Sequence, residues 1–250
     1  ILSIKNEIFN IPYDAEFIID KSVKKIFSKF NVEILKLKFE NEHRYSEKTH
    51  QGLVNVFQKN SKGRINYKFE DNLLNFDFID NKKDNNFNYN GKINLKPFYF
   101  ESVGNFAKIK ISNLINNNSM LIQLLKTETL NNQNLNMSST IEARKILPYQ
   151  NLIDLIVDIN IKEGLIDIDN TKFNWSNYAS FKISDSLIYL SNNHLVLDGI
   201  LNVKINNYNE IYKFFQTPRN FRKEIEKIEF NFRYNFDQEI IVISNIKINY

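Results

Sequence analysis

The sequence predicts a mainly β protein, built as a long, curved antiparallel sheet (a β-groove) of repeated hairpins with two or three short helices. The first observation behind this is strict alternation of apolar and polar residues, as in the runs 33–40 and 228–234. Alternation at period two places apolar side chains on one face of a strand and polar side chains on the other. The second observation is the turn-prone Asn, Asp, Gly and Lys residues that separate such runs, as at 59–63.

Length and composition bound the class of protein. The 250 residues, at 29.7 kDa, suffice for a core, and we expect residues 1–250 to form a single β-rich domain. A hydrophobic content of 42% with 14% aromatics excludes a disordered chain, and 25% charged residues exclude a mostly membrane-embedded one. The chain begins with Ile and carries neither a signal peptide nor an apolar run of membrane-spanning length, which predicts a fragment of a longer protein.

Elements of the first half follow the alternation. Residues 15–30 fit either a helix face or an extended strand, and we favour a strand followed by a short helix. Residues 80–86 are rich in Asn, Asp and Lys and predict a turn. The predicted strands are Ile34 to Phe39, Leu53 to Phe57, Ile65 to Phe69, Leu73 to Ile79, Lys92 to Phe100, and Phe106 to Ile111.

The second half begins with a break in this rhythm. Apolar residues at helical spacing predict one helix over 112–128, capped by Ser112 or Asn113, that packs on the sheet or closes one end of it. A polar loop follows at 131–136, and a short helix is predicted over 207–216. The remaining predicted strands are Ser139 to Ile146, Leu152 to Ile161, Leu165 to Ile168, Ala179 to Leu190, Leu195 to Ile205, Ile228 to Tyr234, and Glu239 to Ile248.

The charge pattern argues against nucleic acid as a partner. The net charge of +4 and the pI near 8.9 are mildly basic, with Lys and Glu interspersed along the chain. A nucleic-acid binder concentrates its Lys and Arg on one face, whereas here the lysines occupy the polar side of each strand. We therefore interpret the lysines as a solvated face. The absence of cysteine excludes disulfides, thiolate zinc sites and cysteine nucleophiles.

The histidines, glycines and the single tryptophan do not form a recognisable catalytic motif. His43 and His50 are seven residues apart, a spacing unlike that of compact zinc motifs, so we interpret both, like His194, as exposed loop residues. The six glycines stand singly, without a phosphate-binding loop, and we interpret Gly63, Gly91 and Gly199 as turn residues. Trp175 is interpreted as part of the core or its rim.

Paired carboxylates are the other route to catalysis. Asp154, Asp158, Asp167 and Asp169 could pair across strands as in a glycosidase. However, Asp167 and Asp169 alternate with isoleucines, as the solvent face of a strand requires. We therefore expect no enzyme, no catalytic residues, no metal site and no cofactor.

One set of segments combines alternating strands with aromatic residues: 91–100, 161–170 with Phe173 and Trp175, 195–199, 212–220 and 228–237. These segments resemble the C-terminal region of AsmA-like proteins, the AsmA and TamB type of bacterial envelope protein. This resemblance implies a periplasmic protein, anchored in the inner membrane by a segment outside this chain, with an apolar β-groove that carries phospholipid acyl chains between inner and outer membranes and supports outer-membrane assembly. It further implies inner- and outer-membrane proteins as partners.

Two functional hypotheses follow from the apolar face. The first is a groove open to lipid acyl chains, since an apolar face left without a second layer requires a partner to shield it. The alternative is a structural or adhesive β scaffold in which the same face is a closed core with no ligand. The expected lining residues of the groove are Leu35, Leu37, Phe39, Ile65, Tyr67, Phe69, Ile93, Leu95, Ile109, Ile111, Phe230 and Phe232.

Overall fold

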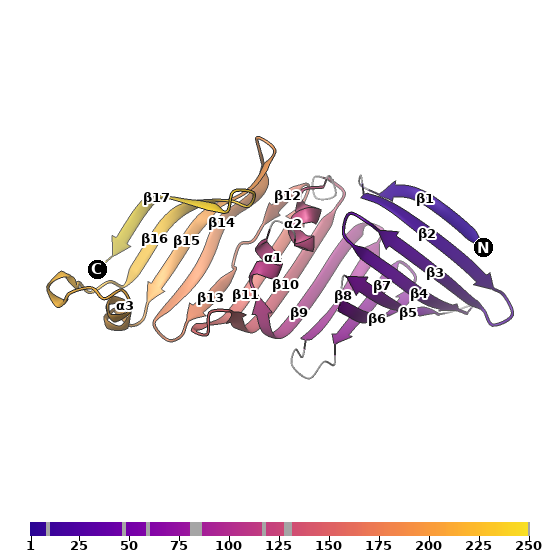
Figure 1. The fold of residues 1–250 in the computed structure, drawn as a ribbon, viewed down its shortest axis with the longest axis horizontal. Helices are drawn as coiled ribbons and strands as arrows, with labels where there is room; N and C mark the ends of the chain where they lie inside the picture. Colours follow the sequence, from indigo (N-terminus) through magenta and orange to yellow (C-terminus); the bar gives the residue numbers. More distant parts are fainter. Residues whose placement is uncertain are drawn as a thin grey trace.

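A single sheet of 17 strands dominates the computed structural model, which describes residues 1–8, 11–46, 49–58, 61–80, 87–116, 119–127 and 132–249 (Figure 1). This confirms the mainly β fold. The strands are β1 (Leu2–Ile8), β2 (Ile11–Asp20), β3 (Lys25–Val32), β4 (Leu37–Tyr45), β5 (His50–Gln58), β6 (Ser61–Glu70), β7 (Leu73–Asp80), β8 (Phe87–Leu95), β9 (Phe98–Lys110), β10 (Asn136–Leu147), β11 (Leu152–Lys162), β12 (Leu165–Asp167), β13 (Lys172–Trp175), β14 (Ala179–Ser191), β15 (His194–Ile205), β16 (Lys227–Asn235) and β17 (Ile240–Asn249).

The ladders run almost entirely between strands that are neighbours in the chain. From β1 to β9 each strand pairs antiparallel with the next, and β13 to β17 do the same, with the short β12 inserted beside β11 and β14. One pair is parallel: Asn136 to Leu147 of β10 aligns with Tyr99 to Lys110 of β9. A parallel pair requires a crossover connection, and here the crossover holds two helices. The chain termini lie at opposite ends of the molecule (Figure 1).

Short helices occupy two connections, and one prediction about them needs correction. The segment predicted as one helix is divided into α1 (Ser112–Ile115) and α2 (Met120–Leu125). The side chain that caps α2 is Ser119, which accepts from the Ile122 backbone N–H at 3.2 Å. The helix predicted over 207–216 is confirmed as α3 (Tyr208–Phe214), capped by Asn207, and a 3-10 turn η1 (Arg219–Phe221) follows it.

Two details of the strands also differ from the prediction, and a third is not tested. The segment 15–30 is a β2–β3 hairpin without a helix, because Asp20 accepts hydrogen bonds from the backbone N–H and the hydroxyl of Ser22 and so stabilises a turn there. The strand predicted from Lys92 to Phe100 contains the β8–β9 turn at Pro97. The predicted turn at 80–86 lies outside the described residues apart from Asp80, which ends β7. Within the described ranges, no helix reaches the length and hydropathy that a bilayer crossing demands.

One face of the sheet, called the inner face below, is traced by residues directly opposite one another on successive strands. Such residues share a face because side chains alternate along each strand. The inner face continues without a break from the N-terminal hairpins to β11. From β4 to β11 one such row is His43, Gly52, Tyr67, Phe76, Gly91, Ser102, Ser139 and Ile159.

Glycines inside strands make room for aromatic rings on this face. A Cβ at Gly52 would collide with the ring of Tyr67, and one at Gly63 would collide with the ring of Phe78. Gly91 and Gly104 stand in the same way against Phe76 and Tyr89. The interpretation of Gly63 and Gly91 as turn residues is therefore wrong, because both lie within strands and their missing side chains are space that a neighbouring ring fills.

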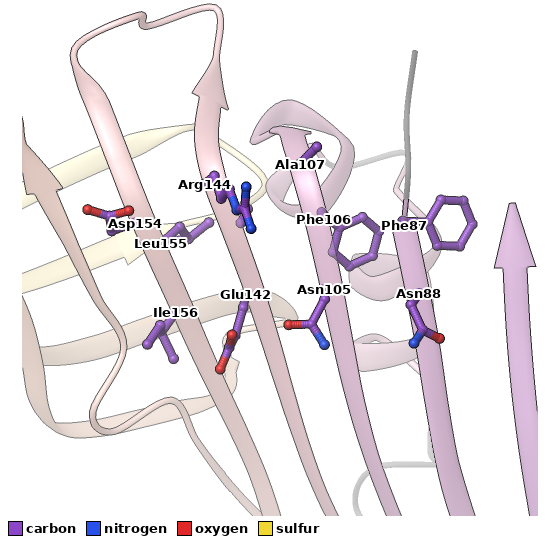
Figure 2. Close-up of a pocket in the computed structure, with 11 residues that line it drawn as sticks. Phe87, Asn88, Asn105, Phe106, Ala107, Glu142, Arg144, Asp154, Leu155 and Ile156 are labelled. Carbon is purple, nitrogen blue, oxygen red and sulfur yellow. The ribbon is translucent and has the colours of Figure 1, made fainter. Parts of the chain in front are cut away.

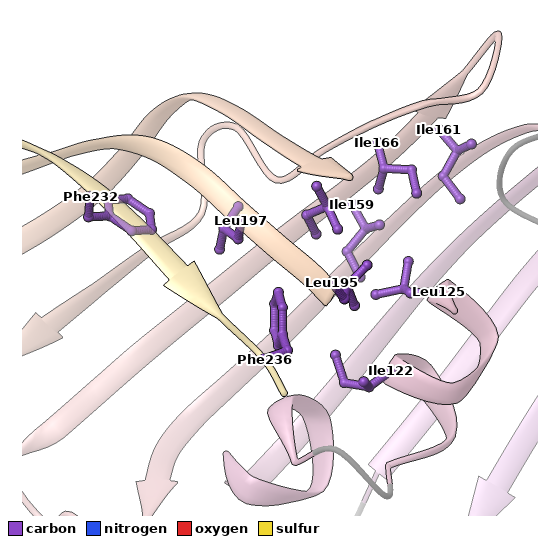
Figure 3. Packing of buried hydrophobic residues seen from close by; sticks show 10 residues of the cluster. Ile122, Leu125, Ile159, Ile161, Ile166, Leu195, Leu197, Phe232 and Phe236 are labelled. Atoms are coloured by element: carbon purple, nitrogen blue, oxygen red, sulfur yellow. The ribbon is translucent and has the colours of Figure 1, made fainter. Parts of the chain in front are cut away.

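Gly199 repeats this arrangement on the C-terminal half, where α2 packs on the sheet. It lies within β15 directly opposite Phe232, so its interpretation as a turn residue is also wrong. Ile122 and Leu125 of α2 point toward Leu195 of β15 and complete a core (Figure 3). Ile122 and Leu195 are each only 1% exposed. The remaining buried members of this core are Ile159, Ile161, Ile166, Ile188, Leu197, Phe232 and Phe236.

The first eight strands have no such cover among the described residues, since no described helix precedes Ser112. The surface area reflects this. The chain exposes 16341 Å², whereas a compact monomer of 29.7 kDa is expected to expose about 11,600 Å². The strand β17 at one edge is exposed along its whole length, including five isoleucines and a valine. Among the described residues, the C-terminal half is therefore covered in part by α2, and the rest of the sheet is a single layer.

Replacing Gly91 with alanine tests the packing of rings over glycines. The new Cβ would overlap the carbonyl oxygen of Glu101 and lie 2.8 Å from Cζ of Phe76, and a backbone carbonyl cannot rotate away. We expect Gly91→Ala to lower the free energy of unfolding in urea by about 1–3 kcal/mol. The exposed Asn88 of the same strand is the control, and Asn88→Ala is expected to change it by less than about 0.5 kcal/mol. Equal stability of the two variants would contradict the packing described.

Candidate functional site

An apolar hollow of about 400 Å³ lies on the inner face, beneath the crossover helices. Its walls come from α1, α2, β10, β11 and β13–β17. The lining side chains are Ile, Leu, Val and Phe apart from Thr171, Tyr149 and Tyr234. The volume falls within the range of about 300–1,000 Å³ typical of small-molecule sites. Such a hollow suits a purely hydrocarbon ligand, because its walls offer almost no hydrogen-bond partners.

The hollow is produced by the parallel β9–β10 pair. The crossover brings Ile122 and Leu125 of α2 over strands that lie 30 or more residues later, and Ile111 at its start lines the same space. A second apolar cluster, Ile109, Ala143, Ile146 and Leu155, forms the adjoining floor. The helical periodicity of 112–128 and the alternation of Leu152 to Ile161 were both visible in the sequence. Their meeting depends on the crossover, which neither pattern indicates.

The structure divides the predicted groove residues among the hollow, the neighbouring apolar clusters, a turn and the open inner face. Ile111 and Phe232 line the hollow, Ile109 lies in the floor cluster, and Phe230 packs against the main core. Leu35 lies in the β3–β4 turn, so its assignment to a strand is wrong. The others lie on the inner face of β4, β6 and β8 and not in the hollow: Leu37, Phe39, Ile65, Tyr67, Phe69, Ile93 and Leu95.

A chain of polar side chains crosses this N-terminal part of the inner face. The hydroxyl of Tyr67 donates to Asn41 Oδ1 at 3.0 Å and lies 2.8 Å from Nδ1 of His43. His43 Nε2 in turn lies 3.2 Å from Nδ1 of His50, and Asn41 Nδ2 donates to Ser28. Because Tyr67 donates to Asn41, its oxygen accepts from His43, which leaves His43 Nε2 to accept from His50. Each of these polar side chains therefore has a hydrogen-bond partner on the inner face.

These contacts correct the interpretation of His43 and His50 as exposed loop residues. Both lie within strands, β4 and β5, and both are half-buried. Burial, and secondarily the charge of His50, lowers the pKa of His43 below its ordinary value. Among the described residues, no group of three His, Cys, Asp or Glu side chains is placed to hold a metal ion.

The outer face carries a larger but different hollow of about 770 Å³ (Figure 2). Glu142, Asn105 and Asn88 occupy paired positions on β10, β9 and β8, with Arg144 and Asp154 nearby. These side chains are exposed to solvent, so their charges are screened. An open hollow of this kind lacks the enclosed, convergent groups that a catalytic site needs.

A second outer-face cluster joins three strands by hydrogen bonds. The guanidinium of Arg233 donates from Nε and Nη2 to the two carboxylate oxygens of Asp198, both at 2.7 Å, and Tyr189 donates to the same carboxylate. The hydrogen bond from Arg233 lowers the pKa of Asp198. Arg233 and Asp198 are directly opposite residues of β16 and β15. The cluster therefore links strands and leaves no free base.

The four aspartates considered for a glycosidase also have structural partners. Asp158 accepts from the hydroxyl of Thr140 at 2.8 Å, and Asp167 accepts from the Asn160 amide at 3.2 Å. Asp169 accepts from the backbone N–H and the hydroxyl of Ser186, and Asp154 accepts from the Asn174 amide at 3.4 Å. These contacts are spread over several strands and turns. They do not form a facing pair of carboxylates.

Comparisons of the chain with protein-family models, with curated proteins and with solved structures find no match. The geometry of the hollow and of the inner face therefore provides the functional argument.

Protonation of His43 is expected to destabilise the fold. A lowered pKa means that the unfolded chain binds more protons than the native one, so stability is complete above the unfolded pKa near 6.5 and falls as the pH drops below it. The urea midpoint is expected to be lower at about pH 5.5 than at about pH 7.5. His43→Gln should reduce this dependence of the midpoint on pH. Asn88→Ala, which changes an exposed residue without an ionisable group, should leave it unchanged. A wild-type midpoint that is constant over this range would contradict the prediction.

Thr171 offers a second test at the hollow. It is only 6% exposed, and its hydroxyl has no hydrogen-bond partner among the described residues. Valine has the same shape without the hydroxyl, so Thr171→Val is expected to raise the free energy of unfolding by about 1 kcal/mol. Thr140→Val, which removes the bond to Asp158, is expected to lower it by about 1 kcal/mol. Destabilisation by Thr171→Val would show that the hydroxyl has a partner in solution.

Proposed function

We propose that this chain binds the acyl chains of phospholipids on its inner face, with the apolar hollow as the tightest part of the site. The observation that carries the proposal is the 400 Å³ hollow with its nearly uniform hydrocarbon lining. Burying an acyl chain there removes apolar surface from water on both partners, which is favourable by about 25 cal/mol per Å². Headgroups need no place in the hollow, because they stay in water at its mouth.

The open part of the inner face supports the same function. Across β4 to β9 this face presents leucine, isoleucine and a series of aromatic rings without a described covering element. Phe87 stacks between Phe78 and Phe106 at centroid distances of 5.0 and 5.3 Å. An exposed apolar surface of this kind marks an interaction site, although the polar side chains from Ser28 to His50 interrupt it on β3 to β6. Transport between the two membranes of a bacterial envelope, from an anchor outside this chain and together with membrane-protein partners, is the wider role that we propose.

A structural or adhesive scaffold is the second candidate. The observation in its favour is the core beneath α2, where Ile122 and Leu195 are fully buried by the protein itself. Under this alternative the inner face contributes only stability. Polar substitutions such as Leu37→Gln or Phe230→Gln would then unfold the protein, whereas in a lipid-binding groove they would mainly reduce lipid uptake.

The sharpest test compares two neighbouring positions on opposite faces of β11. Val157 lines the hollow, whereas Ile156 points to the outer face opposite Glu142. The phenyl ring introduced by Val157→Phe should fill part of the hollow. Because a packed interior does not accept extra volume, the binding of a fluorescent fatty-acyl probe should fall by at least about tenfold. Ile156→Phe should bind the probe as the wild type does.

Mass spectrometry of the purified protein provides the complementary measurement. We expect phospholipid to co-purify with the wild type and with Ile156→Phe, and to be depleted in Val157→Phe. Circular dichroism and urea unfolding would confirm that all three proteins are folded. A folded wild type that carries no lipid and binds no probe would refute the proposed function.

A further inference from the structure

Three exposed phenylalanines gather in the connection between β15 and β16, which we call the aromatic tip (residues 208–223). Phe214, Phe215 and Phe221 are 62%, 66% and 69% exposed. The tip consists of α3 and η1 and lies at one end of the sheet, away from the N-terminal strands (Figure 1). Phe214 and Phe215 contact each other edge-on at a centroid distance of 5.2 Å. Exposed apolar groups that gather in one short segment mark interaction sites.

Hydrogen bonds within the tip hold its backbone in place. The backbone N–H of Thr217 donates to the carbonyl of Tyr212 at 2.9 Å and ends α3, with Gln216 at a positive φ of 53°. Arg222 Nε donates to the carbonyl of Thr217 at 2.9 Å, and the Lys223 backbone N–H donates to the Tyr212 hydroxyl at 3.2 Å. The phenyl rings are therefore presented to solvent by a defined structure.

The tip is also basic. From residue 211 to residue 223 the sequence contains Lys213, Arg219, Arg222 and Lys223 and no Asp or Glu. Lys213 pairs with Glu210 at 2.5 Å, which leaves an excess of positive charge around the rings.

Two acidic residues next to the tip reduce this excess of positive charge without removing it. Glu224 and Glu226 follow the tip in sequence. The backbone of Glu226 already bonds to Ile205 and Asn249 in the sheet, so this residue lies on the side of the strands. The exposed end of the tip therefore combines phenylalanine rings with cationic side chains.

Further aromatic side chains border the tip. Trp175 packs edge-on against Phe214 at a centroid distance of 4.8 Å. The backbone N–H of Ser176 donates to the Asn151 carbonyl at 2.7 Å, which joins the β13–β14 turn to the turn that carries Tyr149. Tyr149 is 58% exposed and also lines the apolar hollow. Aromatic residues thus extend from the tip to the edge of the hollow.

We propose that the aromatic tip docks on the surface of a bilayer that contains anionic phospholipids. Phenylalanine, tryptophan and tyrosine partition into the interfacial region of a bilayer, and Lys and Arg are attracted to its anionic headgroups. The exposed rings and the local positive charge match both properties of that surface. Docking does not depend on lipid binding in the hollow, since the tip is a separate surface.

The single tryptophan makes this interaction measurable in the unmodified protein. Trp175 is half-buried beside Phe214, so its emission should shift to shorter wavelength when the tip enters the interface. The probes are vesicles of phosphatidylcholine alone, and vesicles in which phosphatidylglycerol replaces about a third of it. We expect the protein to sediment with the anionic vesicles, and binding to weaken by at least about tenfold with neutral vesicles or at about 1 M salt.

Two variants separate the two contributions. Phe221→Ser removes a ring that does not contact Trp175, whose contacts are with Phe214 and Phe215. Arg219→Glu reverses a charge without removing a ring. Each is expected to weaken binding to the anionic vesicles by at least about tenfold. The matched control is Ile18→Ser, at a position 46% exposed on the outer face of β2, at the far end of the sheet. It should bind as the wild type does.

Binding of the tip to vesicles does not depend on the lipid-binding site in the hollow. Val157→Phe is expected to keep vesicle binding while losing the acyl probe, so failure of one proposal is distinguishable from failure of the other. Docking would be overturned by any of three results: no sedimentation with anionic vesicles, equal binding to neutral vesicles, or equal losses in the β2 control and the tip variants.

Discussion

Packing of side chains across neighbouring strands on one face is the interaction on which this structure depends. The first eight strands have no helix over them among the described residues, so their apolar side chains are buried mainly by one another. Glycines make this possible, since Tyr67 lies over Gly52 and Phe76 lies over Gly91. The rings cover backbone that would otherwise face water, and each ring ties two strands together. A single-layer sheet can thereby hold its register without a second layer.

The parallel β9–β10 pair changes this arrangement in the second half. Its crossover places α2 over the later strands, and Ile122 and Leu125 complete a core that the strands alone would leave open. The same crossover leaves a hollow beside the core, because two short helices do not cover the whole face. The core and the proposed lipid site therefore have one origin, and they differ only in whether protein or ligand fills the space.

The polar groups of the molecule are distributed differently on the two faces of the sheet and at the tip. Outer-face clusters such as Arg233 with Asp198 link strands where solvent screens their charges. On the inner face, the polar side chains of Ser28, Asn41, Tyr67, His43 and His50 hydrogen-bond to one another, so that few unpaired polar atoms face the apolar surface. The tip is the contrasting case, since its basic side chains and phenyl rings face solvent together. Lipid in the hollow and a bilayer at the tip would be neighbouring surfaces, joined through Tyr149.

Alternation in the sequence determined the strands, and with them the division into an apolar and a polar face, because side-chain period is a local property of an extended backbone. This alternation was sufficient for most strands from β4 onward, and helical spacing was sufficient for α3. Pro97 is the local signal that separates β8 from β9. Only the tertiary structure decided which apolar residues meet. Leu35 fell in a turn, His43 met His50 across a hairpin, and Gly91 received a ring from β7. The hollow depends on long-range pairing of β9 with β10, and no local pattern in the chain specifies that partner.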